Sequence, residues 1–314
     1  MRDVHVYLPP DYEAITEPLI ALWDLAAFTN SGAGHVAWRN HGENLPQRLD
    51  RLIGESKLPP VICVLPDCYT SLGGNQYVNS PAVGRYANYL VDELVPFISA
   101  RYNVIEGRAG RAVFGKSSGG YGALYHAMHF SETWGAAASH AGDAGFDLVY
   151  QPGFPDACLA LNEFGDNPQK FIRHFWSKNK PVGRDFSTMM TLAMAASYDP
   201  DPEAPDKIRL PFDYRHCQLD HERWKNWLAF DPVNMVDRCV AALKSLHGLY
   251  IDVGRQDQYF IQLGSRRLAD KLEEHSVRYH YEEFDGTHSA IDWRLDYSLP
   301  FLVDALKKAV KEAN

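Results

Sequence analysis

One stretch of the sequence, RAVFGKSSGGYGALYHAMHF at residues 111–130, sets the expectation for the whole fold. It opens with the apolar run RAVF, passes through GKSSG at residues 115–119, and continues as a helix-like run. Small residues are required at both ends of GKSSG if a strand turns tightly into a helix there, because the backbone is strained and neighbouring chains approach closely. This context of strand, turn and helix around G-x-S-x-G predicts a nucleophile elbow with Ser117 at its tip.

Short apolar or β-branched runs recur on both sides of this stretch and alternate with amphipathic segments. The runs predicted as strands are VHVYL, PLIALWDL, VICVLPD, RAVFGKS, GAAASHA, GLYIDVG and RYHYEEF. The clearest helix pattern lies at residues 84–100, where apolar side chains recur at steps of three and four. Such alternation predicts a mostly parallel central sheet flanked by helices, which together with the elbow indicates an α/β-hydrolase fold.

Residues 144–230 break this rhythm, being rich in Pro, Asp and aromatic residues, with helix-like pieces at 156–176 and 187–197. We expect residues 1–143 and 231–314 to form the hydrolase core and 144–230 to form a helical lid that supplies walls of the substrate pocket. A helical insertion without contact to substrate is the alternative. Its aromatic side chains either line an acyl or aryl pocket or pack the insertion's own core: Phe171, Phe175, Trp176, Trp224 and Trp227.

A serine hydroxyl is a poor nucleophile near neutral pH, so it needs a histidine to take its proton and a carboxylate to orient that histidine. In this fold the three residues follow the chain order Ser, Asp, His. GLYIDVGRQDQYF places Asp257 just beyond a predicted strand, and RYHYEEFDGTHSAIDW places His288 in the loop after the next one. The predicted catalytic triad is therefore Ser117 as nucleophile, His288 as base and Asp257 as orienting acid.

Other candidates for the base and the acid fit the pattern less well. His126 and His129 fall within the helix after the elbow and are expected to point away from the serine, whereas His140 ends a strand and keeps a possible role in the pocket. Asp252 is the main rival acid, but it lies within a strand pattern rather than in the following loop. Asp285 is too near the proposed base along the chain.

Taken together, these segments resemble the putative-esterase family of α/β-hydrolases, which includes esterase D-like, feruloyl esterase-like and enterochelin esterase-like enzymes. The resemblance spans most of the chain and rests on VYLPPDY, VICVLPD, RYANYLVDELVPFISARYNV, RAVFGKSSGGYGAL, IDVGRQDQ and FDGTHSAIDWR. It implies a serine esterase with the same triad. The expected reaction is hydrolysis of a small or aryl carboxylic ester through an acyl-enzyme on Ser117.

Two backbone N–H groups are expected to hold the oxygen that becomes negative during acyl transfer. The first belongs to Ser118, at the start of the helix after the elbow. For the second, relatives often carry His-Gly or Asp-Gly after the third strand, whereas this chain has ALWDLAAFT at residues 21–29. The N–H of Leu25 is therefore predicted as the second donor, with that of Ala26 as the alternative.

The composition narrows the range of partners and compartments. The 31 basic and 40 acidic side chains give a net charge of −9, which disfavours nucleic acid and anionic membrane surfaces. The N-terminal residues show no signal-peptide pattern, and no run is long enough to span a bilayer. Five cysteines without C-x-x-C spacing indicate reduced thiols, as expected in a cytoplasmic protein.

No cofactor or metal is expected. His216, Cys217 and His221 lie close together, but no fourth ligand is apparent. Glycine patterns for nucleotides or dinucleotides are absent. The expected partner is a small-molecule ester, and exposed aromatics of the insertion could support a homo-oligomer. Two alternatives stay open: an acyltransferase that uses the same triad, and a non-catalytic binding protein on this fold.

Overall fold

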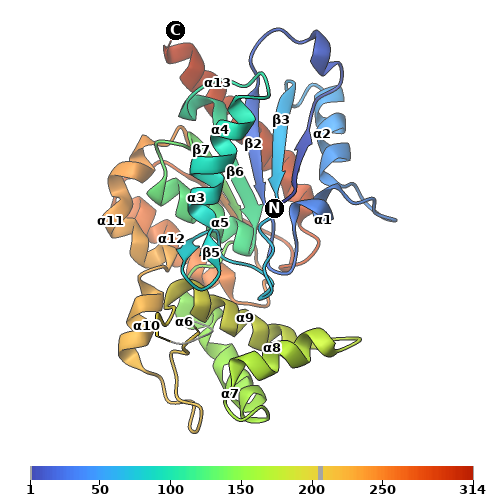
Figure 1. Ribbon diagram of the computed structural model, residues 1–314. Coiled ribbons are helices and arrows are strands. Elements are labelled where there is room, and N and C mark those ends of the chain that lie inside the picture. Colours follow the sequence, from blue (N-terminus) through green and yellow to red (C-terminus); the bar gives the residue numbers. More distant parts are fainter. Residues whose placement is uncertain (1, 204–207, 314) are drawn as a thin grey trace.

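The computed structural model describes residues 2–203 and 208–313, and a seven-stranded sheet lies at its centre (Figure 1). Six strands run parallel, and only the edge strand β1 is antiparallel to its neighbour. All seven predicted strands are present, which confirms the mostly parallel α/β sheet. In spatial order they are β1 (Val4–Tyr7), β3 (Val61–Pro66), β2 (Ile20–Leu25), β6 (Arg111–Lys116), β7 (Ala136–His140), β8 (Gly248–Gly254) and β9 (His280–Phe284).

Helices cover both faces of this sheet. On one face lie α3 (Tyr86–Asn88), α4 (Val95–Ser99), α5 (Ser118–His129), α11 (Pro232–Ser245) and α12 (Ile261–Glu274). On the other face lie α1 (Gly32–Val36), α2 (Leu45–Gly54) and α13 (Leu295–Ala313). Among the described residues, no helix combines the length and the apolar character needed to cross a bilayer.

The helix predicted at residues 84–100 begins at Tyr86, because Gly84–Arg85 instead forms β5, which pairs with β4 (Asn79–Ser80). Its middle turn, Tyr89–Leu94, is π-helical and precedes α4. Pro96 has no N–H to donate to the preceding turn, which accounts for the interrupted α-helical ladder.

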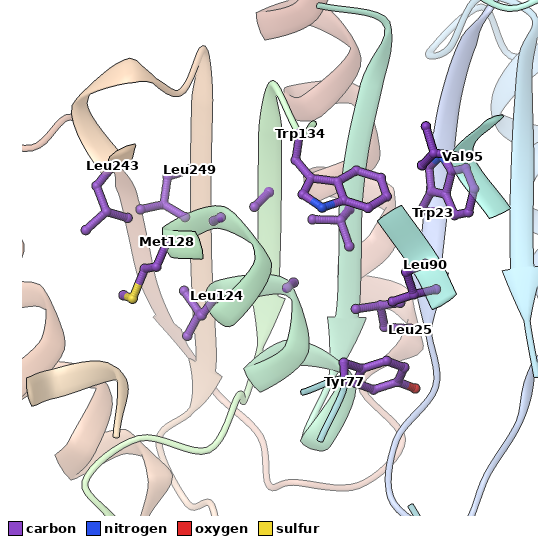
Figure 2. Packing of buried hydrophobic residues seen from close by; sticks show 14 of the residues in the cluster. Trp23, Leu25, Tyr77, Leu90, Val95, Leu124, Met128, Trp134, Leu243 and Leu249 are labelled. Carbon is purple, nitrogen blue, oxygen red and sulfur yellow. The ribbon is translucent and has the colours of Figure 1, made fainter. Parts of the chain in front are cut away.

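Two tryptophans anchor the core between the sheet and the helices around α5 (Figure 2). Trp23 of β2 and Trp134, which precedes β7, meet edge to face with ring centroids 5.4 Å apart. Trp134 also donates its indole N–H to Nδ1 of His126 in α5 at 3.1 Å. The other ring nitrogen of His126 donates to the carbonyl oxygen of Tyr77 at 3.0 Å, which fixes this buried histidine as the neutral tautomer.

Residues 144–230 supply most of a second apolar cluster at one end of the molecule, which Leu72, Val78 and Tyr121 complete (Figure 1). Their helices are α6 (Phe146–Val149), α7 (Phe154–Asn162), α8 (Pro168–Ser177), α9 (Gly183–Tyr198) and α10 (His221–Leu228). Of the five aromatics left open above, four are buried in this cluster, and Trp176 is half exposed. The division of the chain into a core and a lid stays a prediction.

One carboxylate joins the beginning and the end of this segment. Asp231, at the N-terminus of α11, accepts the N–H of Gly145 at 3.0 Å and that of Phe146 at 2.8 Å. It also caps its own helix through the N–H of Val233 at 3.1 Å. Burial raises the pKa of Asp231, and the three backbone donors oppose that rise. Asp231 therefore ties the two ends of residues 144–230 together.

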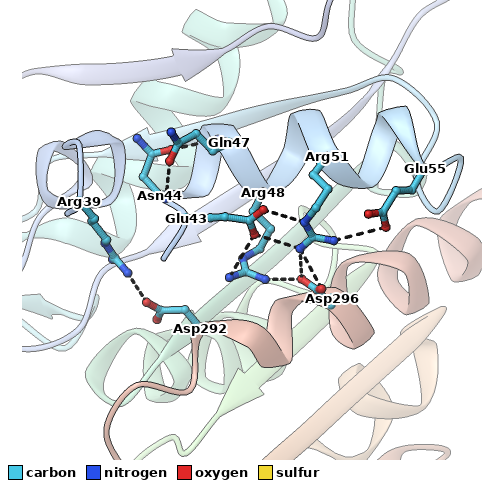
Figure 3. A network of polar contacts seen from close by, with 9 residues as sticks. All are labelled: Arg39, Glu43, Asn44, Gln47, Arg48, Arg51, Glu55, Asp292 and Asp296. Carbon is cyan, nitrogen blue, oxygen red and sulfur yellow. Dashed lines mark hydrogen bonds and ion pairs between the residues drawn. The ribbon is translucent and has the colours of Figure 1, made fainter. Parts of the chain in front are cut away.

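An ion-pair network ties α2 to the start of α13 on the opposite face (Figure 3). Arg51 binds Glu43 at 2.7 Å and Asp296 at 2.9 Å, and Arg48 also contacts Asp296. Arg39 pairs with Asp292 in the loop before α13. The network holds the C-terminal loop that follows β9 against the N-terminal third of the chain.

We predict that His126 makes stability depend on pH. Burial lowers the pKa of His126 to about 4, whereas an unfolded histidine titrates near 6.5. The unfolded chain therefore takes up a proton first as the pH falls. The stabilisation is complete above pH 6.5 and is lost toward pH 4, by up to about 3 kcal/mol. Urea unfolding of wild type and His126→Gln between pH 7.5 and 4 measures this, and parallel curves for the two proteins would refute it.

Candidate active site

Ser117 occupies the turn between β6 and α5 with a backbone φ of 55° and ψ of −124°. A serine at positive φ is strained, and the turn persists because neighbouring chain segments enforce it. A Cβ on Gly119 would lie 1.8 Å from the carbonyl oxygen of Leu25, and one on Gly115 would lie 2.4 Å from the same oxygen. Both positions are therefore restricted to glycine, as the sequence predicts.

His288 and Asp257 meet in the loops that follow β9 and β8. The imidazole Nδ1 donates to Oδ2 of Asp257 at 2.7 Å, and both side chains are buried. Because a carboxylate only accepts, this bond leaves Nε2 of His288 as the free base. The acid is itself fixed by the N–H of Tyr259, which donates to its Oδ1 at 2.9 Å. The ring of Tyr259 also packs edge to face on the imidazole, with centroids 4.9 Å apart.

The rival acid Asp252 belongs to a different network. It accepts from Nδ1 of His140 at 2.6 Å and from Nε of Arg294 at 2.7 Å, and all three side chains are buried. The other imidazole nitrogen of His140 bonds Ser298 at 2.8 Å. Asp252 makes no hydrogen bond to His288 and therefore belongs to a network separate from that of Asp257.

Ser117 and His288 line one pocket of about 620 Å³. Ala27, Phe28 and Thr29 from the loop after β2 form one side of it. Residues of the 144–230 segment form another side: Val149, Gly183, Phe186, Ser187 and Met190. The remaining lining residues are Lys116, Asp143, Tyr259 and Ile261. The pocket is thus largely apolar, with a few polar groups beside the serine.

The two predicted oxyanion donors lie in different surroundings. Ser118 is the first residue of α5, so its N–H has no acceptor within the helix. Leu25 is the fully buried last residue of β2 and does not line the pocket. Ala27, two residues further along, does line it. Within the described ranges, the N–H of Ala27 donates to no other protein group.

A second cavity, of about 170 Å³, lies behind Lys116 and Ala27, which line both spaces. It holds charged pairs, including His35 with Asp24 and Arg39 with Asp292. Burial lowers the pKa of Lys116 despite the nearby carboxylates. Among the described residues, no group of three or more His, Cys, Asp or Glu side chains is arranged to hold a metal ion.

Sequence reasoning missed Asp143 and Gln76. Asp143 is buried beside the serine pocket, and Gln76 donates to it at 3.1 Å. A usable signal existed for Asp143 alone, since it lies two residues beyond a predicted strand. The strand order places β7 between β6 and β8, so the loops that carry Ser117, Asp143 and Asp257 are neighbours.

Comparison with solved structures identifies the fold. A ferulic acid esterase aligns with a TM-score of 0.61 at 19% identity, covering 97% of this chain and 92% of that one. The fluorophosphonate-binding serine hydrolase F of Staphylococcus aureus aligns with a TM-score of 0.59 at 17% identity, covering 97% and 92%. An S-formylglutathione hydrolase of Agrobacterium tumefaciens gives 0.58 at 16%, covering 97% and 90%. These likenesses confirm the α/β-hydrolase fold.

Sequence comparison adds a curated relative and a family. Esterase Rv1288 of Mycobacterium tuberculosis is 36% identical over 91 residues, a match that covers 27% of this chain and 19% of the relative. The model of the putative esterase family matches residues 1–298, nearly the whole chain. The resemblance inferred from the motifs is confirmed: the chain belongs to the putative esterase family.

Proposed function

We propose that the protein hydrolyses small or aryl carboxylic esters through an acyl-enzyme on Ser117, with His288 as base and Asp257 as orienting acid. One observation carries the proposal. A serine held at positive φ shares a pocket with a histidine whose Nδ1 is bonded to a buried aspartate, which leaves Nε2 to accept a proton. Nucleophilic acyl transfer requires an activated serine, a base that shares its pocket and an acid that orients the base.

The reaction proceeds in two steps. Nε2 of His288 takes the proton of Ser117 while the serine oxygen attacks the ester carbonyl carbon. The imidazolium then returns that proton to the departing alcohol, which leaves the acyl group on the serine. The same imidazole then deprotonates a water, which attacks the acyl carbon; the bond to the serine oxygen breaks, the serine takes the proton back from the imidazolium, and the acid leaves. Asp257 accepts the Nδ1–H and stabilises the imidazolium in both steps.

The oxyanion that forms in each step needs donors fixed in advance. We assign the first to the N–H of Ser118, as the sequence predicts. For the second we favour the N–H of Ala27 over that of Leu25, because Ala27 lines the pocket and its N–H is without a protein acceptor among the described residues. The carbonyl oxygen of Leu25 faces the turn at Gly115 and Gly119, where it leaves no room for a Cβ.

In this proposal, residues 144–230 determine which esters fit the pocket. Phe186 and Met190 of α9 line the pocket opposite the core loops, and Phe28 adds a further aromatic wall. Apolar walls of this kind favour acyl or aryl groups over strongly hydrated ones. We therefore propose that this segment acts as the lid over the ester.

We predict that Ser117→Ala abolishes both ester hydrolysis and covalent labelling by a fluorophosphonate probe. The probe reacts only with a serine activated by its base, and the alanine has no oxygen to react. Intact mass spectrometry and an ester assay check this. Ser289→Ala, which changes an exposed serine beside the base, is the control and is expected to label fully. Undiminished turnover by Ser117→Ala would exclude the proposed nucleophile.

Asp257→Asn is predicted to lower kcat, and Asp252→Asn is predicted to lower stability. Asp257→Asn stabilises the wrong imidazole tautomer, so kcat is expected to fall about 10³–10⁴-fold with little change in Tm. Asp252→Asn breaks a buried pair with Arg294 and is expected to cost about 3–5 kcal/mol of stability, with kcat per folded molecule retained. Thermal unfolding and active-site titration separate the two effects. The reverse pattern would make Asp252 the orienting acid.

Met190→Ala is predicted to raise KM for long-chain or aryl esters about tenfold and to leave acetate esters nearly unaffected. The substitution removes apolar contacts that only the larger group reaches. Steady-state kinetics on a chain-length series measures the effect, with Leu159→Ala as control because Leu159 is exposed on α7 and does not line the pocket. Equal effects on acetate and longer esters would contradict a role of α9 in the pocket.

A further inference from the structure

The pocket contains a carboxylate that the proposed mechanism does not use. Asp143 follows β7, is only 4% exposed, and lines the pocket together with Ser117 and His288. No Lys, Arg or His side chain of the described residues forms an ion pair with it. A buried charge without a counter-charge is costly, so folds retain one mainly where it has a task.

The two oxygens of Asp143 have different surroundings. Oδ2 accepts the hydroxyl of Tyr150 at 2.7 Å and the amide Nε2–H of Gln76 at 3.1 Å. Oδ1 receives no hydrogen bond from the described residues. Because Asp143 lines the pocket of Ser117, this oxygen is the one left to pair with a group bound there.

The carboxylate is rigidly held. Gln76 also lies 2.9 Å from the hydroxyl of Tyr198, so its amide joins Asp143 to the insertion. Gln76 and Tyr77 both adopt positive φ, at 54° and 58°, which is unfavourable for residues other than glycine. The loop is kept in this state by Asn75, which accepts the N–H of Tyr77 at 2.7 Å, and by the Tyr77 hydroxyl, which donates to Ala26 at 2.6 Å. Strain of this kind is concentrated at ligand-binding sites.

Orientation of the base is not the task of Asp143, because Nδ1 of His288 is already bonded to Asp257. Burial raises the pKa of Asp143, and the bonds from Tyr150 and Gln76 and the nearby His288 oppose that rise. The geometry identifies the group that can pair there: Tyr150 and Gln76 both donate to Oδ2, and Oδ1 of the carboxylate can accept a further hydrogen bond. The matching ligand group is therefore a donor.

We propose that Oδ1 of Asp143 binds a hydroxyl or ammonium group carried by the acyl or the alcohol part of the substrate, so that the physiological ester bears a hydrogen-bond donor. The inference rests on the proposed function, since it places this donor in the pocket of Ser117. An analogue that ends in a methyl group leaves this buried acceptor without a partner. Such an analogue is disfavoured, because no bond to water of equal strength replaces the lost hydrogen bond.

The first test needs only the wild-type enzyme and two matched sets of esters. One set varies the acyl end as aryl butanoate, 3-hydroxypropanoate and 3-aminopropanoate, and the other varies the alcohol end as propyl, 2-hydroxyethyl and 2-aminoethyl acetate. Within at least one set, the hydroxyl or the ammonium member is expected to have at least tenfold higher kcat/KM than the methyl member. Which of the two is preferred identifies the donor. Equal or faster hydrolysis of the methyl member in both sets would overturn the proposal.

The second test assigns the preference to a residue. Asp143→Asn is expected to reduce the ratio of kcat/KM between the donor-bearing and the methyl ester to below threefold. Asp147→Asn, which changes an exposed acid on α6 that pairs with Arg267, is expected to keep the wild-type ratio. A wild-type ratio in Asp143→Asn would overturn the assignment. If this variant does not fold, the wild-type comparison alone decides.

Fluorophosphonate labelling of wild type distinguishes the two proposals. Labelling at Ser117 without donor preference refutes the Asp143 subsite and leaves the proposed function intact. Hydrolysis that persists in Ser117→Ala refutes the proposed function itself, and the subsite proposal with it.

Discussion

The active site depends on one steric constraint, the contact of the Leu25 carbonyl with the turn that carries Ser117. Neither Gly115 nor Gly119 has room for a Cβ against that oxygen, so strand β2 fixes how closely β6 and α5 can approach it. This approach holds the serine at positive φ and directs the first N–H groups of α5 toward the pocket. His288 and Asp257 can then lie on independent loops, because the position of Ser117 is already determined by the sheet.

Polar side chains at the carboxyl ends of the strands fall into two groups with different surroundings. Lys116, His140 and Asp252 are paired in register across β6, β7 and β8 and face the second cavity or the helix α13. Ser117 and Asp143, one and three positions later in the same loops, line the larger pocket instead, and Lys116 lines both spaces. The same strand ends therefore carry both a buried polar network and residues of the larger pocket. Asp257, five positions after Asp252, accepts from His288 rather than from His140.

Features with a local signal could be read from the sequence, and features created by distant contacts could not. The seven strands, the elbow glycines and the Asp257–His288 contact follow from apolar runs, turn residues and strand order. The limits of β2 decide whether Leu25 or Ala27 reaches the pocket, and a pattern of apolar residues does not fix a strand end to two residues. Gln76 has no local signal, because its position depends on a strained loop fixed by Tyr77 and Asn75.

The carboxylate of Asp231 is a shared anchor for two stretches of chain that lie 86 residues apart in the sequence. Both ends of the 144–230 segment are fastened by the same carboxylate, at Gly145, at Phe146 and at the cap of α11. Changes of length between these points leave the backbone bonds at the anchor in place, but they alter the pocket, because Val149, Phe186 and Met190 line it. Asp143 lies just before the anchor, yet Tyr150 of the segment donates to its carboxylate, so a replaced segment would have to supply a new donor for Asp143 as well.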